Sequence, residues 1–189
     1  HRYRREFHAL RAVLHAGGYL EDNQVTALGV LASALYGESA LLVAMAVQEG
    51  WLVGMGPAEI AATLVMVANE DRGRERRGRP EFPTTRVDLA YRHLRGALQH
   101  LGALEESHGI QTLRALSVDY VVAAYAWVMG TSLSDLEAEQ RADLGDIVKA
   151  MKNLYSLLRQ LEQALRGHAL QPAVRAARER TERDLIRRV

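Results

Sequence analysis

The stretch that decides the fold is PAEIAATLVMVAN, residues 57–69. Pro57 suits the first position of a helix, because the N–H that proline lacks has no intrahelical partner there. Residues 60–68 are apolar almost all round, and a helix without a polar face is stable only inside a packed body. Two further segments share this character, residues 40–47 and 120–129. We expect these three segments to form the core.

The rest of the chain is predicted to form further helices around this core. Glycines and prolines separate segments of helix length in which apolar residues recur three and four apart. The pattern predicts an all-α protein, a single multi-helix bundle of eight or nine helices. They are expected at about 3–16, 26–36, 39–49, 57–69, 85–107, 110–129, after Ser132 or Ser134, at 144–166 and from Pro172. Residues 70–83 read as an exposed loop, and no linker divides residues 1–189 into two domains.

Composition narrows the class of protein. The 189 residues include 24 Lys and Arg against 23 Asp and Glu, a net charge of +1, and no cysteine. Disulfides and thiolate metal sites are therefore excluded, and the longest apolar run, 120–129, is half of the roughly 20 residues that a membrane helix needs. The charges are unevenly distributed, since residues 16–69 and 96–146 are acidic and residues 147–189 are basic. This distribution fits either one basic face or ordinary solvated helix faces.

Motifs of catalysis are absent from the sequence. It contains no GxxxxGK[ST] phosphate loop, no GxGxxG, no HExxH and no GxSxG. His1, His8 and His15 are seven residues apart, as are His93 and His100. Seven residues of helix rise about 10 Å, too far for two ligands of one ion. We predict no catalytic residue, no metal ligand and no enzyme activity for this chain alone.

The segment 144–166 is the most informative for function. Its apolar residues predict one buried helix face, and its other face is a stripe of donors at spacings of three, four and seven: Lys149, Lys152, Asn153, Ser156 and Gln160. The stripe contains no acid, whereas a solvated helix face usually mixes charges of both signs. Cations and short polar side chains suit phosphates and sugars. The stripe is therefore a candidate nucleic-acid site, with a plain amphipathic helix as the alternative.

Many short motifs occur along the chain in a recognisable order. The first half supplies Gly18-Tyr19-Leu20, Leu28-Gly29, Glu49-Gly50, Pro57, Glu59-Ile60-Ala61-Ala62 and Asp71-Arg72. The second half supplies Ala126-Trp127, Gly130, Gly145 to Lys149, Leu157 to Leu161 and Arg183 to Ile186. Together these motifs resemble the C-terminal helical (DSHCT-like) domain of Ski2/Mtr4-like superfamily 2 DEAD/DEAH-box RNA helicases, closer to bacterial versions. The family commonly has Arg and Glu where this chain has Asn153 and Ser156, which implies weaker or differently selective contact with the strand.

The resemblance implies a function beyond the residues themselves. The chain is expected to be a C-terminal helical-bundle domain excised from a longer, cytoplasmic, ATP-dependent RNA or DNA helicase. Its helix 144–166 would be the ratchet helix that guides single-stranded nucleic acid, RNA more than DNA, during unwinding. ATP and Mg²⁺ would bind to the RecA-like motor domains, which with a winged-helix domain would be its intramolecular partners, and no membrane is involved.

Two further readings stay open. The loop arginines are either a second basic contact or part of a solvated connector: Arg72, Arg74, Arg76, Arg77 and Arg79. The alternative function is a helical protein-interaction module that docks a partner or regulates the motor. Its docking face would be the acidic segment 131–146, with Asp135, Glu137, Glu139, Asp143 and Asp146.

Overall fold

The computed structural model describes residues 12, 15–16, 18, 20–21, 24–25, 27–35, 40–71, 78–111, 113–140 and 143–183. Eight helices, α2 to α9, account for most of these residues, and the all-α prediction is confirmed. The described part also holds a small antiparallel pair, β1 (Leu20–Glu21) with β2 (Gln24–Val25). The helix expected at 3–16 lies largely outside the described residues.

Helix α4 (Pro57–Ala68) is the centre of the structure. Its residues Ile60, Leu64 and Met66 are fully buried, and it packs against α5, α6, α8 and α9. The predicted start is confirmed, since Gly56 is the N-cap, Pro57 follows it, and the Gly56 N–H donates to Glu59 Oε1 at 3.4 Å. The three segments expected in the core are largely buried, as their lack of a polar face requires. The exception is Met129 at the end of the third segment, which is 64% exposed.

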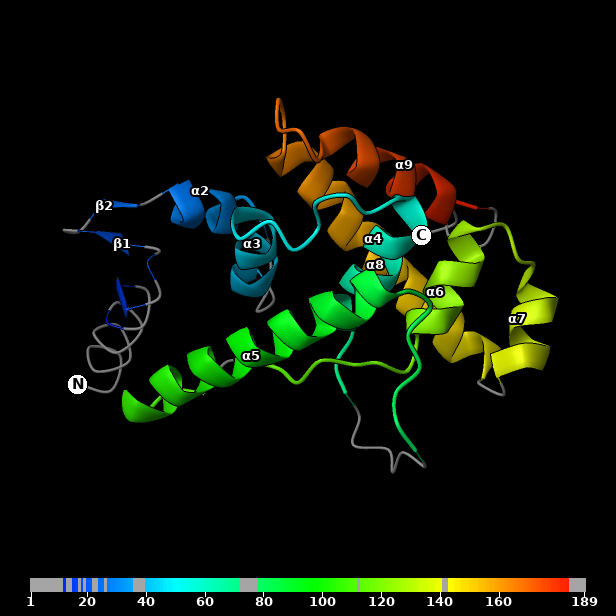
Figure 1. Cartoon of the computed structure of the whole chain (residues 1–189), viewed down its shortest axis with the longest axis horizontal. Helices are drawn as coiled ribbons and strands as arrows, with labels where there is room; N and C mark the ends of the chain where they lie inside the picture. Colours follow the sequence, from blue (N-terminus) through cyan, green and yellow to red (C-terminus); the bar gives the residue numbers. More distant parts are fainter. Residues whose placement is uncertain are drawn as a thin grey trace.

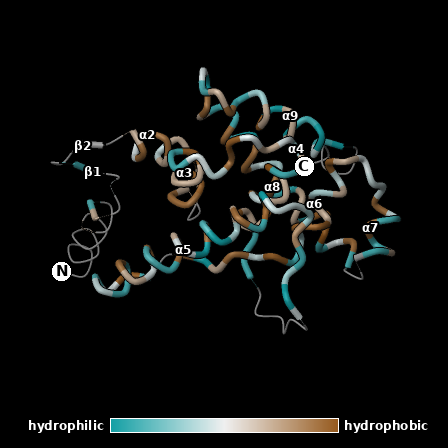
Figure 2. The backbone as a smooth tube through the Cα atoms, viewed as in Figure 1, coloured by the Kyte–Doolittle hydropathy of each residue, from teal (hydrophilic) through white to brown (hydrophobic). Residues whose placement is uncertain are grey.

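Helices α2 (Ala27–Ser33) and α3 (Ala40–Gln48) lie toward the same end of the structure as the β1–β2 pair (Figure 1). Helix α2 packs on α3, and Gly50 ends α3 with a φ of +76°, as its position after the helix predicts. The long helix α5 (Thr85–Ser107) matches its predicted bounds. Hydrophilic and hydrophobic stretches alternate along it in Figure 2, which is typical of a helix with one buried face.

One helix is shorter than predicted. Helix α6 covers only Val121–Val128, and residues 113–118 are extended, so the expected helix over 110–129 is wrong in its first half. The extended segment finds its hydrogen bonds elsewhere: Ser117 N–H donates to Met66 O at 3.0 Å and Leu113 N–H to Glu105 Oε2 at 3.2 Å. These long-range partners replace the bonds of a helix, and local periodicity cannot reveal them.

The last three helices start and stop near their predicted positions. Helix α7 (Leu133–Gln140) is capped by Ser132, whose Oγ accepts from the Asp135 N–H at 3.2 Å. Helix α8 (Leu144–Ala164) is capped by Asp143, and Gly167 follows it with a φ of +79°. Helix α9 (Gln171–Thr181) then runs beside α8. No helix among the described residues is both long and apolar enough to cross a membrane.

Arg183 ties the end of the described chain to α6. Its guanidinium lies 3.8 Å from the centre of the Trp127 ring and donates to Thr131 O at 2.8 Å and Trp127 O at 3.2 Å. The indole N–H of Trp127 donates to Thr181 O at 3.0 Å. Two short motifs more than fifty residues apart in the sequence therefore form one contact.

Replacing Arg183 by alanine removes these two hydrogen bonds and the stacked cation. We expect Arg183→Ala to lower the free energy of unfolding by about 2 kcal/mol, measured by urea denaturation followed by circular dichroism. The control is Arg180→Ala, because Arg180 is exposed on α9 and its loss should cost less than about 0.5 kcal/mol. Equal losses in the two variants would show that the Trp127 contact contributes nothing.

Candidate nucleic-acid interface

Helix α8 has one buried and one open face, as its sequence predicts. Ile147, Met151, Leu154, Leu158 and Leu161 are fully buried against the rest of the body. On the opposite face Lys149, Asn153 and Ser156 are exposed, and Lys152 and Gln160 are partly exposed. The structure therefore brings the five predicted residues together; their contact with nucleic acid stays a prediction. We call this row, Lys149, Lys152, Asn153, Ser156 and Gln160, the α8 stripe.

The two lysines provide the charge of the α8 stripe. Neither ammonium group has a hydrogen bond or an ion pair with any residue that the structure describes. The lysines are three residues apart on one helix, which places them about one turn from each other. Their charges are available to an anion from solvent.

Asn153 has a structural contact that its sequence position did not reveal. Its Nδ2 donates to Asn69 Oδ1 at 3.0 Å. Asn69 stands at the C-terminal end of α4 and donates its own Nδ2 to Val65 O at 3.1 Å and Ala150 O at 3.3 Å. Asn69 thus joins the central helix to the middle of α8, and the Asn153 side chain is oriented by it.

Ser156 and Gln160 form a second polar pair further along the stripe. Gln160 Nε2 lies 3.5 Å from Ser156 Oγ, one helical turn away. Both residues keep solvent contact. The distance is at the outer limit of a hydrogen bond, so a strand could replace this contact at small cost.

The proposed secondary basic contact falls mostly outside the described residues. Arg72, Arg74, Arg76 and Arg77 lie there, and only Arg79 is described, as an exposed residue. Their role stays a prediction. Among the described residues no group of three or more His, Asp or Glu side chains could hold a metal ion.

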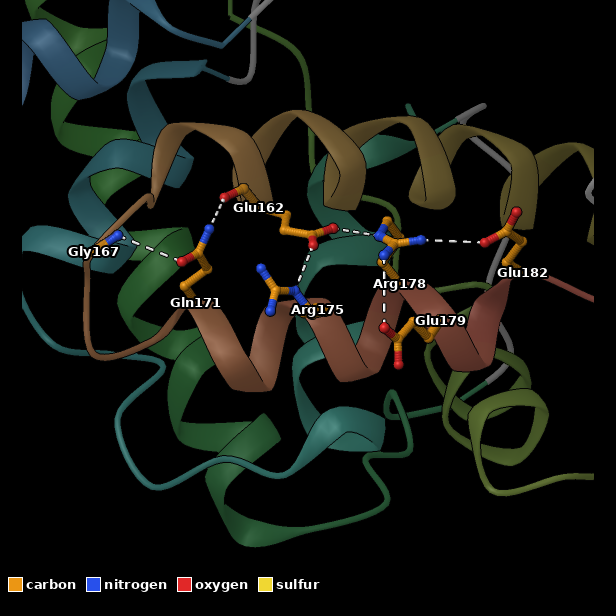
Figure 3. Close-up of polar contacts among 7 residues, drawn as sticks. All are labelled: Glu162, Gly167, Gln171, Arg175, Arg178, Glu179 and Glu182. Atoms are coloured by element: carbon orange, nitrogen blue, oxygen red, sulfur yellow. Dashed lines mark hydrogen bonds and ion pairs between the residues drawn. The ribbon is translucent and has the colours of Figure 1, made fainter.

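A charged network that the sequence analysis missed joins α8 to α9 (Figure 3). Glu162 accepts from Arg175 Nε at 2.9 Å and from Arg178 Nε, and its side chain is only 14% exposed. Arg178 also pairs with Glu182 at 3.2 Å and with Glu179 at 3.7 Å. The sequence spacing signals only the Arg178–Glu182 pair, whose members are four residues apart. The contacts of Glu162 depend on how α9 packs on α8, which local spacing does not reveal.

Backbone contacts at that turn complete the network. Gln171 Nε2 donates to Glu162 O at 2.9 Å, and the Gly167 N–H donates to Gln171 Oε1 at 3.4 Å. Gln171 therefore satisfies one of the last carbonyl groups of α8. The two helices are held in one register by side chains on both.

The network shifts the titration of Glu162. Partial burial by itself raises the pKa of this carboxyl group, but the hydrogen bonds and charges of Arg178 and Arg175 outweigh it and lower the pKa below its ordinary value of 4.5. The same hydrogen bond has the opposite effect on its donor and raises the pKa of the Arg178 guanidinium. Both groups are therefore charged at neutral pH.

Comparison with known proteins identifies the domain. Residues 22–188 match the family described as the DSHCT (NUC185) domain. The chain belongs to the DSHCT domain family, the helical C-terminal domain of Ski2-like helicases. The family resemblance in the sequence is thereby confirmed.

The curated relatives carry the names of helicases. The chain is 34% identical over 182 residues to a probable helicase HelY of Mycobacterium leprae (strain TN), covering 91% of this chain and 19% of the relative. It is 31% identical over 185 residues to a probable helicase HelY of Mycobacterium tuberculosis (strain H37Rv), covering 91% and 20%. A DExH-box ATP-dependent RNA helicase, DExH15 chloroplastic of Arabidopsis thaliana, is 26% identical over 163 residues, covering 83% and 14%. This DSHCT domain therefore spans about a fifth or less of these relatives.

The lowered pKa of Glu162 predicts how stability depends on pH. The ionised carboxylate stabilises the fold at pH values above 4.5, and this contribution is lost as the pH falls through the folded pKa. We expect Glu162→Gln to lower the free energy of unfolding by about 2 kcal/mol at neutral pH. The difference from the unmodified protein should shrink below pH 4.5.

Glu179→Gln is the matched control, because the side chain of Glu179 is 59% exposed and touches the same Arg178. Its cost should stay below about 0.5 kcal/mol at every pH. Urea denaturation at a series of pH values measures both. If the loss of unfolding free energy caused by Glu162→Gln does not change with pH, the lowered pKa of Glu162 is contradicted.

Proposed function

We propose that this DSHCT domain guides single-stranded nucleic acid, RNA or DNA, along the α8 stripe of an ATP-dependent Ski2-like helicase. The observation that carries the proposal is the stripe itself, in which two lysines without a described partner lie among neutral donors. No acidic side chain interrupts this face between Lys149 and Gln160. A nucleic-acid backbone needs this combination of charge and hydrogen-bond donors.

The packing of α8 supports the same function. Its opposite face is fully buried at Met151, Leu154 and Leu158, and Asn69 fixes its middle to α4. Side chains on a buried helix are held more precisely than side chains on a loop. A strand could therefore slide past the stripe without deforming the domain.

The catalytic parts of the helicase belong to other domains in this proposal. ATP and Mg²⁺ would bind to RecA-like motor domains of the parent protein, with which this bundle and a winged-helix domain would enclose the strand in the cytoplasm. The domain alone would bind a strand weakly and hydrolyse nothing. Between RNA and DNA we favour RNA.

The described acids of α7 favour a second function. Asp135, Glu137 and Glu139 are all exposed, and α7 packs on α6. An exposed acidic helix suits docking on a basic surface of a partner or of the motor. This role uses a different helix and is compatible with strand contact on α8.

Reversing the charge of both lysines tests the strand contact. We expect Lys149→Glu with Lys152→Glu to weaken binding of a fluorescent 20-nucleotide single strand by at least about tenfold at low salt. The measurement is fluorescence anisotropy over a series of salt concentrations. The unmodified domain should lose affinity as salt rises, by a slope of about 0.7 in log–log units for each phosphate contact.

The control changes the same charge elsewhere, with Arg95→Glu and Arg180→Glu on α5 and α9, both exposed. It should retain most of the affinity, because neither residue lies on the stripe. The proposal fails if the domain binds no strand at low salt, or if the stripe variant and the control weaken binding equally.

A further inference from the structure

An open groove lies between α8 and α9, beside the Glu162 network. Its volume is about 370 Å³, and four of its lining residues are arginines against a single acid, Glu162. Arg159 comes from α8, Arg166 from the turn that follows α8, and Arg175 and Arg178 from α9. We call this the α8–α9 groove.

The arginines of the groove differ in how far they are already used. Arg178 is occupied by three carboxylates, those of Glu162, Glu179 and Glu182. Arg175 gives only its Nε to Glu162, and Figure 3 draws no contact from its two terminal nitrogens to the residues shown.

Arg159 and Arg166 are exposed and have no polar partner among the residues that the structure describes. Glu162 is already matched by Arg175 and Arg178, so it cannot neutralise them. The groove therefore keeps a positive charge and free guanidinium donors.

The groove is continuous with the α8 stripe. Lys152 and Arg159 are seven residues apart on α8, and a heptad spacing rises about 10.5 Å while turning by about 20° on a straight helix. This rotation about the helix axis places Arg159 nearer than Lys152 to the side of α8 that carries Glu162, which contacts α9. Arg166 follows in the turn after α8 and lines the same groove. Cations thus follow one path from the open face of α8 into the groove.

The side chains of the groove indicate what binds there. A guanidinium group presents paired N–H donors that match two oxygens of a phosphate. Tyr155, which is partly exposed at the same groove, adds an aromatic surface of the kind on which bases stack. Gln163 and Gln171 add neutral amides. This set suits a phosphodiester strand better than an acidic peptide, which has no base to stack.

We propose that the α8–α9 groove is a second phosphate-binding site, in which Arg159, Arg166 and the free nitrogens of Arg175 hold the strand after it leaves the α8 stripe. The inference rests on the proposed function, since it extends the path of the same strand. The α8–α9 groove would add at least two phosphate contacts to those of Lys149 and Lys152.

Neutralising the two exposed arginines tests the groove without touching the ion pairs. We expect Arg159→Gln with Arg166→Gln to weaken binding of a 20-nucleotide single strand by about fivefold at low salt. The log–log salt slope should fall by about 1.4, the value for two contacts. Gln163→Glu, an exposed residue of the same groove, should weaken binding in the same direction while leaving every arginine in place.

The control is Arg95→Gln with Arg180→Gln, which removes the same charge on α5 and α9. If the stripe variant weakens binding and the groove variants match this control, the second site is wrong and the proposed function stands. If only the groove variants weaken binding, the common path from the stripe is wrong. A ten-residue glutamate peptide that displaces the strand at equal concentration would also overturn the assignment to phosphates.

Discussion

Helix α4 has no polar face, and the rest of the structure is arranged to surround it. Its residues from Ile60 to Met66 are fully buried, and burial of apolar side chains is the main favourable contribution to folding. Helices α5, α6, α8 and α9 all pack on it. Each of these helices must therefore turn one face inward, and the positions of their outward residues follow from that requirement.

The functional surfaces follow from this packing. Because α8 buries Met151, Leu154 and Leu158 against the body, its lysines face solvent. Because α9 packs on both α4 and α8, the arginines of α9 come to lie beside the last turns of α8. Glu162 fixes that arrangement by holding Arg175 and Arg178. The acid thus orients two of the four arginines of the α8–α9 groove, Arg175 and Arg178, and it lies beyond the end of the stripe rather than on it.

The sequence predicted features that depend on local chemistry. Pro57, Ser132 and Gly50 marked real helix ends, and the periodicity of 144–166 predicted which face of α8 is exposed. The sequence did not predict that residues 113–118 are non-helical, because their hydrogen-bond partners Met66 and Glu105 come from other elements. The Glu162 network was missed for the same reason, since the register between two helices depends on packing. The sequence predicted that Asn153 contacts nucleic acid, and only the structure shows the hydrogen bond of its side chain with Asn69.

Crosslinking tests most directly whether the open face of α8 contacts nucleic acid. A photoreactive amino acid at position 156, where the exposed Ser156 stands in the stripe, is irradiated with a labelled single strand. The same group at the exposed Ser107 of α5 is the control. If the open face of α8 contacts the strand, we expect strong, salt-sensitive crosslinking from position 156 and little from position 107. Equal yields from the two positions, or none from position 156 at low salt, would contradict it.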